Sequence, residues 1–167
     1  MNFKLAAGGL MAAAFLTAPA LAETSYNPDR VIKSVENDDL VAIVKSLDHE
    51  VAQVSSDDSR MVAGRDENGL VYVLLGTACD AAGVSGCQGV NMQVRWDLPE
   101  GTTAANVARA NLERAAISTW MLEDSGTLGF SRYVVLDYGV TMANLRENVK
   151  VLLDVMPYAR KIATGEE

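Results

Sequence analysis

Apolar and polar side chains alternate strictly from Val90 to Trp96. A period of two is typical of a strand with one buried and one solvent-facing side, so we predict a strand over residues 88–98. The run at 70–76 is apolar on both faces and follows an Asn-Gly turn, which indicates a central strand of a sheet. These two strands are predicted to pair as a hairpin.

Shorter apolar patterns predict the remaining strands. Residues 51–54 and 61–64 each contain spaced apolar residues bounded by polar segments, which favours two short strands. Residues 117–123 and 130–138 are rich in β-branched and aromatic residues, and the segment between them is typical of a turn. We therefore predict a second hairpin there.

Three segments repeat their apolar residues at helical spacing. Residues 29–47 contain an acidic interruption near Asn37, so two short helices and one broken helix fit equally well. Residues 103–115 follow a threonine that can cap a helix. The last helix is predicted to start between Gly139 and Thr141. Its apolar stripe consists of Met142, Leu145, Val149, Leu152 and Met156.

Hairpins that alternate with helices predict an α+β fold, in which an antiparallel sheet built from hairpins carries flanking helices. Residues 23–167 are sufficient for one domain with its own core, and we expect a single domain. The last helix has additional apolar residues, Val151, Val155 and Ile162, that lie off its stripe. Packing against two core elements is the favoured explanation, and a partner or dimer interface is the alternative.

The beginning of the chain, residues 1–22, has the pattern of a secretory signal peptide. Lys4 precedes an uncharged apolar run at 5–16, and the segment ends at Ala22 in the small-x-small pattern that a signal peptidase accepts. An uncleaved anchor helix is the alternative, but Pro19 interrupts the segment before the roughly 20 apolar residues that a span requires. We expect cleavage after Ala22, a periplasmic or secreted product, and no membrane anchor after cleavage.

The charge balance restricts the class of partner. The chain carries 22 acidic and 14 basic residues, a formal net charge of −8. This balance repels the phosphate backbone of nucleic acids and anionic membrane surfaces, and the sequence contains no basic cluster that would offset the repulsion. We therefore expect a protein partner and no nucleic acid.

The two cysteines, Cys79 and Cys87, are separated by a short loop that contains glycine. In an oxidising compartment such a pair predicts a disulfide, worth about 2 to 3 kcal/mol. A redox-active pair is the alternative, although such pairs are normally spaced Cys-x-x-Cys. A zinc site needs four ligands, or three and a water, and the single histidine, His49, is far from both cysteines in the sequence.

The sequence contains no recognisable catalytic motif: no nucleophile elbow, phosphate-binding loop, dinucleotide fingerprint or His-Glu-x-x-His. His49 lies between Asp48 and Glu50, a setting typical of a solvated surface histidine. Adjacent acids such as Asp66 and Glu67 fall in predicted turns, where carboxylates serve solvation and local hydrogen bonding. We expect no catalytic residue, no cofactor and no metal, and keep a carboxylate-dependent envelope hydrolase as an alternative.

The aromatic residues of the second predicted hairpin include Trp120, Tyr133 and Tyr138, and Arg132 adjoins Tyr133 in the sequence. Core packing explains most aromatic side chains, whereas an exposed aromatic ring beside an arginine suits a peptide or a small ligand. We therefore take Trp120, Arg132 and Tyr133 as the candidate binding residues.

In this order of elements, the chain after its export segment resembles the YbjN family of bacterial sensory transduction regulators. The resemblance rests on the opening helix, the cysteine pair that leads into Gln88-Gly-Val-Asn-Met-Gln93, and the helix that bears Asn111. It also rests on the two strands within 120–138 and the small-residue start of the last helix at 139–141. Many members carry a tryptophan immediately before the helix asparagine, where this chain has an alanine.

The resemblance implies a fold like that of the type III secretion chaperones, which are often dimeric and act by binding. It therefore implies a non-enzymatic binding or regulatory role with a protein partner, and it allows a homodimer. A secreted inhibitor that presents the loop 80–86, held by the predicted disulfide, is a second hypothesis.

Overall fold

The computed structural model describes residues 25–56 and 59–166. The predicted signal peptide, residues 1–22, lies outside the described residues. The strands are β1 (Val31–Ile32), β2 (Glu50–Val54), β3 (Met61–Arg65), β4 (Val71–Cys79), β5 (Cys87–Asp97), β6 (Ser118–Leu122), β7 (Thr127–Val135) and β8 (Val140–Thr141). The helices are α1 (Asn37–Ser46), α2 (Ala104–Glu113), α3 (Met142–Thr164) and a short 3₁₀ helix at Ala81–Gly83. In these ranges no helix is both long enough and apolar enough to cross a membrane.

Six strands form one antiparallel sheet in the order β2-β3-β4-β5-β7-β6, and β1 pairs with β8 in a separate two-stranded sheet. The predicted α+β fold is confirmed, and β4, the strand predicted to be central, lies inside the sheet. The two predicted hairpins join because β7 pairs with both β5 and β6.

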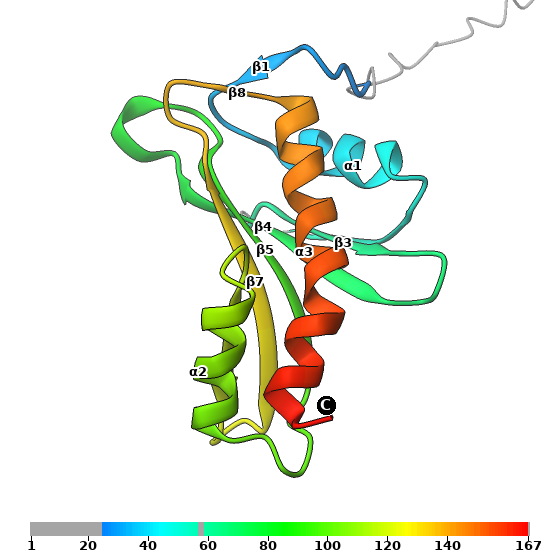
Figure 1. Ribbon diagram of the computed structural model, residues 1–167. Helices are drawn as coiled ribbons and strands as arrows, with labels where there is room; N and C mark the ends of the chain where they lie inside the picture. Colours follow the sequence, from blue (N-terminus) through cyan, green and yellow to red (C-terminus); the bar gives the residue numbers. More distant parts are fainter. Residues whose placement is uncertain (1–24, 57–58, 167) are drawn as a thin grey trace, which may run out of the picture.

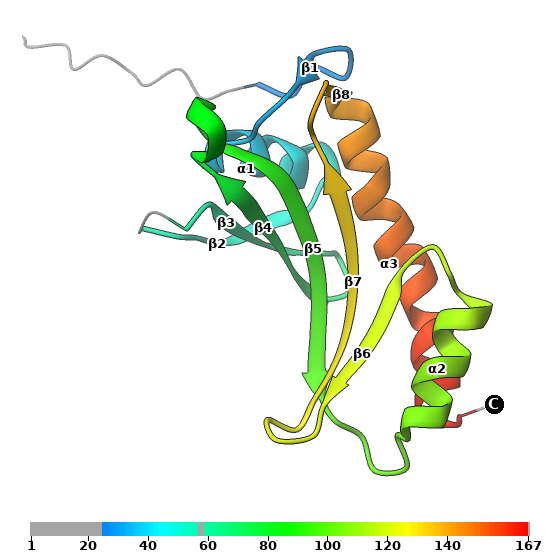
Figure 2. The same cartoon turned by 90° about the vertical axis from the view of Figure 1, so that its left-hand side faces the viewer.

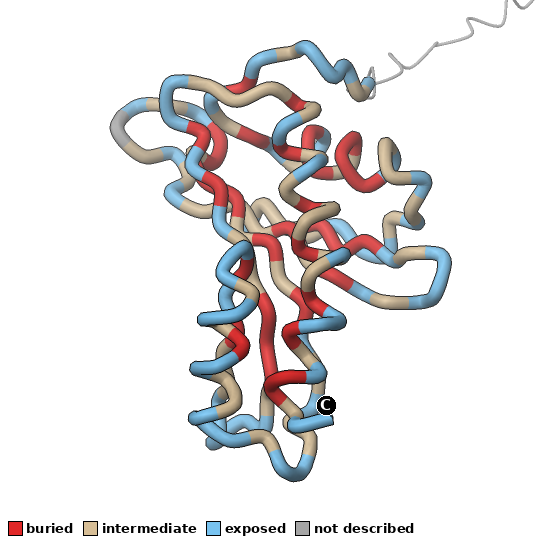
Figure 3. Tube along the Cα trace, viewed as in Figure 1, coloured by how far each residue is buried: buried red, intermediate tan, exposed pale blue. Residues whose placement is uncertain are grey.

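The alternation of β5 divides the sheet into two unlike faces. Val90, Met92 and Val94 are buried toward the helices, and Figures 1 and 2 show α1, α2 and α3 on that face. Buried residues concentrate between this face and the helices (Figure 3). Among the described residues no helix covers the opposite face, which we call the open face of the sheet.

The segment predicted to begin the first helix is a strand instead. Val31 pairs with Thr141, and the backbone of Val35 exchanges two hydrogen bonds with that of Cys87. The acidic residues near Asn37 form the first turn of α1, where negative charge is favoured. The Asp39 carboxylate accepts a hydrogen bond from the Glu36 backbone N–H at 3.0 Å, as in a capping box.

The long C-terminal helix follows its predicted stripe, and all five stripe residues are buried. Thr141 caps the helix by accepting a hydrogen bond from the Asn144 backbone N–H at 3.1 Å. Ile162, which lies off the stripe, is also buried in the core, and Val155 packs against the core while half-buried. At these two positions the surplus apolar surface is core packing, the favoured explanation.

Helix α2 is fixed to the outer edge of the sheet by one side chain. The Asn111 amide donates to the Thr119 carbonyl and accepts from the Thr119 N–H, both at 2.8 Å. An asparagine side chain thereby satisfies backbone groups that β6, as an edge strand, would otherwise leave unpaired. Ala110, at the position where many family members carry tryptophan, is fully buried.

The predicted disulfide is confirmed: Cys79 and Cys87 are bonded and face each other across β4 and β5. The bond closes a loop that Asp80 also braces, because its carboxylate accepts a hydrogen bond from the Gly86 N–H. Arg60 forms ion pairs with Glu36 at 2.9 Å and with Asp80 at 3.2 Å. The stapled loop is therefore tied to the start of α1.

Candidate partner-binding surfaces

Trp120 projects onto the open face of the sheet. Its register partner across β6 and β7 is Gly129, and the indole lies flat over that glycine, because a Cβ added there would meet the ring at 2.1 Å. The Arg95 guanidinium stacks 5.5 Å from the ring centroid, and the indole N–H donates to Ser131 at 3.3 Å. Contacts with Gly129, Arg95 and Ser131 therefore fix the orientation of the indole ring.

Tyr133 projects onto the same face in the same manner. Its register places it beside Asn91 of β5, and its ring crosses over Gly89, whose added Cβ would meet the hydroxyl at 2.2 Å. The hydroxyl accepts a hydrogen bond from Thr77 at 3.0 Å. Because 53% of Tyr133 remains exposed, this ring is available to a ligand.

Arg132 faces the other side of the sheet. Its Nε donates to Asn148 of α3 at 2.6 Å, and its guanidinium also donates to the Ala116 carbonyl. Neighbouring residues of a strand point to opposite faces, so the structure brings Trp120 and Tyr133 onto one surface and places Arg132 elsewhere. The arginine that lies beside Trp120 is Arg95, and not Arg132 as predicted.

Replacing Gly129 with alanine should displace the Trp120 ring, since the added methyl would overlap the indole. We expect a loss of about 1 to 3 kcal/mol in the free energy of unfolding, the usual cost of overpacking, and a reduced near-ultraviolet circular dichroism signal from tryptophan. A variant whose spectrum and urea midpoint equal those of the parent would show that the ring does not lie on this glycine.

A groove of about 710 Å³ opens on the helix side of the sheet, between α3 and the turn that joins β3 to β4. Its apolar lining is continuous with the core, because these side chains are buried or packed against it while half-buried. The apolar lining residues are Leu47, Leu70, Trp96, Leu153 and Met156. We call this site the α3 groove.

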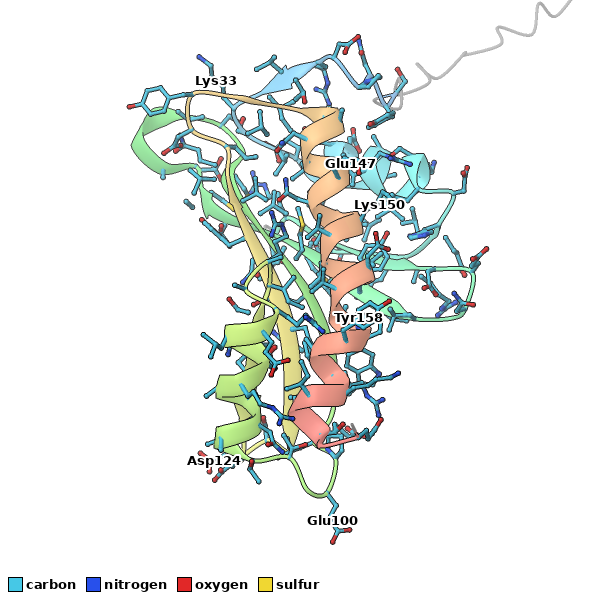
Figure 4. The ribbon with its side chains drawn as sticks, viewed as in Figure 1. Lys33, Glu100, Asp124, Glu147, Lys150 and Tyr158 are labelled. Carbon is cyan, nitrogen blue, oxygen red and sulfur yellow. A yellow bond between two sulfur atoms is a disulfide. The ribbon has the colours of Figure 1, made fainter. Side chains whose placement is uncertain are left out.

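The two walls of the α3 groove carry opposite charge. Helix α3 contributes four cationic side chains and one carboxylate, and the β3–β4 turn contributes Asp66 and Glu67. Figure 4 shows Lys150, one of the four cations, projecting from the side of α3. The cationic residues are Arg146, Lys150, Arg160 and Lys161. Their ion pairs lie within α3 or its C-terminal end, as for Lys150 with Asp154 at 3.9 Å.

Pro157 lies in the wall of the groove as well as in the middle of α3. Proline has no backbone N–H, so the carbonyl of Leu153, four residues earlier, receives no helical hydrogen bond from this position. The α3 groove therefore combines apolar side chains with charges of both signs.

His49 also borders the groove and is not the fully solvated surface residue predicted above. Its Nδ1 lies 3.0 Å from the Tyr72 hydroxyl, and its ring meets the Tyr72 ring edge-on. Burial raises the pKa of Tyr72, and the nearby Asp66 carboxylate raises that pKa further. Tyr72 therefore remains a neutral phenol that can donate to the histidine nitrogen.

The carboxylates of the groove have structural partners. Asp66 accepts hydrogen bonds from the backbone N–H groups of Asn68 and Leu70 at 2.9 and 2.8 Å, which fixes the β3–β4 turn. Within the described ranges, no three His, Cys, Asp or Glu side chains are placed to hold a metal ion. Nothing in this arrangement singles out a pair of acids for catalysis.

Comparison with known families decides the identity of the fold. Residues 37–156 match the YbjN family, described as "Putative bacterial sensory transduction regulator". The chain belongs to the YbjN family. The resemblance that the sequence suggested is thereby confirmed, and the matched segment contains the open face and most of the α3 groove. No curated protein sequence matches the chain significantly.

Solved structures share this YbjN fold at low sequence identity. The crystal structure of YbjN from E. coli has a TM-score of 0.53 and 12% identity, over 77% of this chain and 96% of that one. A chain of the ExsC–ExsE complex has a TM-score of 0.53 and 16% identity, over 76% and 92% of the two chains. A chain of the HopA1–SchA chaperone–effector complex has a TM-score of 0.50 and 16% identity, over 71% and 88%.

Proposed function

We propose that this YbjN-family chain is an exported, non-catalytic protein-binding module that holds a segment of a partner protein in the α3 groove. The observation that carries the proposal is the groove itself, an apolar depression of about 710 Å³ between two charged walls. Concave sites with apolar lining and a few fixed polar groups are where proteins hold ligands.

The groove also indicates the chemistry of the segment. Apolar side chains of the partner would cover Leu153 and Trp96, which are half-buried without it. Acidic side chains would lie along α3, and basic ones beside Asp66 and Glu67. This arrangement fits an amphipathic segment with charges of both signs, because complementary charges fix the register and exclude other partners.

Two of the similar folds support a binding role. They were solved as the HopA1–SchA chaperone–effector complex and as the ExsC–ExsE complex. The predicted signal peptide and the Cys79–Cys87 disulfide support a location outside the cytoplasm, since structural disulfides persist in oxidising compartments. A second copy of the chain is another occupant that the experiment below distinguishes by the mass of the complex.

An inhibitor that presents the loop 80–86 is the second candidate function. Its supporting observation is rigidity, because the disulfide, the Asp80–Gly86 hydrogen bonds and the Arg60 ion pairs fix both ends of the loop. A preorganised loop loses little conformational entropy on binding. Binding through this loop would be insensitive to substitutions in the α3 groove.

The test is capture of a partner from periplasmic extract by the purified chain, followed by titration of the identified partner against variants. Lys150→Glu reverses one charge on the α3 wall, and Leu153→Asp places a charge in the apolar lining. We expect each to weaken binding at least about tenfold, corresponding to about 1.4 kcal/mol.

Arg109→Glu also replaces a cation with a carboxylate, at an exposed position of α2 outside the groove, and is the matched control. It should leave the affinity for the groove partner unchanged. Equal affinity of the parent and both groove variants would contradict the proposal, and a complex with twice the mass of the chain would assign the groove to a homodimer.

A further inference from the structure

Tyr138 has a backbone conformation that tyrosine rarely adopts. It occupies a turn closed by a hydrogen bond from the Gly139 N–H to the Leu136 carbonyl at 2.9 Å, and its φ is +66°. The third position of such a turn normally requires glycine or asparagine, because a side chain collides with the backbone at positive φ. The fold therefore tolerates local strain at this residue.

The side chain of Tyr138 makes no contact with the described residues that would stabilise the fold and offset this strain. It is 97% exposed, and no hydrogen bond or ring contact within the described ranges involves its phenol. A glycine here would form the same turn without strain. Strained residues that the fold does not need are concentrated at functional sites.

The surroundings of Tyr138 form a small surface at the end of the molecule where β1 pairs with β8 (Figure 1). Val31 is 60% exposed, and its side chain lies against the backbone of Gly139. Lys33, Val84 and Asp137 share a shallow depression with Tyr138. We call Val31, Lys33 and Tyr138 the Tyr138 surface.

The depression beside Tyr138 carries one cation, Lys33, and one carboxylate, Asp137. The Asp137 carboxylate accepts a hydrogen bond from the Gln88 amide at 3.1 Å, whereas Lys33, labelled at this end in Figure 4, enters no ion pair with any described residue. The Lys33 ammonium is therefore open to a carboxylate of a partner beside the exposed ring of Tyr138, while the Asp137 carboxylate is held by the Gln88 amide.

The surface is held rigidly. Val31 and Ile32 of β1 pair with Thr141 and Val140 of β8, the strand that directly follows the Tyr138 turn. The adjoining loop 80–86 is closed by the disulfide. A ring on a fixed backbone, with only two side-chain torsions to immobilise, binds at low entropic cost and is a preferred anchor of protein interfaces.

We propose that Tyr138 is the anchor of a second protein-contact surface, distinct from the α3 groove. Its partner is a folded protein that offers a concave apolar pocket for the phenol ring and a carboxylate at the pocket rim for Lys33. The ring projects from a turn and is almost entirely exposed, so the partner supplies the concave side. The proposal stands independently of the groove.

The test places a photo-crosslinking amino acid at Tyr138 in the full chain, expressed in its bacterial host. We expect one discrete adduct with a heterologous protein. Leu112, 83% exposed on α2, is the position-matched control and should give none. Lys33→Glu should reduce the Tyr138 adduct at least about tenfold, and Lys150→Glu should leave it unchanged.

Tyr138→Gly supplies a second measurement. It should raise the midpoint of thermal unfolding by about 2 to 4 °C, and it should remove the adduct when the crosslinker is moved to Val31. The proposal is overturned by an equally strong adduct at Leu112, by no adduct at Tyr138, or by an adduct with a second copy of the chain. Persistence of the adduct in Lys33→Glu, or a lower midpoint in Tyr138→Gly, would also overturn it.

Discussion

Replacing Asp39 with alanine is expected to lower the free energy of unfolding by about 3 kcal/mol. The buried Asp39 carboxylate caps α1 through the Glu36 N–H and pairs with the Arg30 guanidinium. Its loss removes the Asp39 half of the capping box and leaves a half-buried arginine without its counter-ion. Urea unfolding, followed by far-ultraviolet circular dichroism, measures the change directly.

Asp38→Ala is the matched control for this prediction. Asp38 is the exposed neighbour in the first turn of the same helix, so its removal costs only its interaction with the helix dipole, about 0.5 kcal/mol. Similar urea midpoints for the two variants would mean that the cap and the ion pair do not stabilise α1.

Replacing both Cys79 and Cys87 with alanine is expected to cost about 2.5 kcal/mol of unfolding free energy. The bond joins residues eight positions apart, and the cost is the entropy that the unfolded chain regains when this short loop opens. The β4–β5 ladder continues beyond the bond, so the fold should persist with reduced stability. Guanidinium unfolding under oxidising conditions tests this prediction.

Reductant provides the internal control. Dithiothreitol should shift the parent chain to lower guanidinium midpoints and leave the double variant where it was. If the parent and the double variant unfold at the same midpoint before reduction, the bond contributes nothing to stability.

The sheet was predictable because its signal lies within single strands. Strict alternation located β5, and a run apolar on both faces located β4. The first helix was placed too early because Val31, Ile32 and Val35 match helical spacing. Their true partners, Thr141, Val140 and Cys87, are distant in sequence, and no local pattern records such tertiary pairing.

The candidate surfaces were predictable only in part for the same reason. Trp120 and Tyr133 were identified as aromatic residues of one hairpin, but Arg132 alternates to the opposite face of β7. The α3 groove combines α3, the β3–β4 turn and Trp96, which only the folded chain brings together. Its local signal was the surplus of apolar and cationic residues along the last helix.

The β2 strand ends the sheet with an irregularity. Glu50 and Val51 pair with β3 in one register, and Gln53 and Val54 pair in another, so Ala52 is an additional residue that forms a bulge. A bulge bends an edge strand and interrupts the even row of donors and acceptors that an incoming strand would need. Edge-to-edge joining of sheets from colliding copies, a common first step of aggregation, is therefore disfavoured on this side of the molecule.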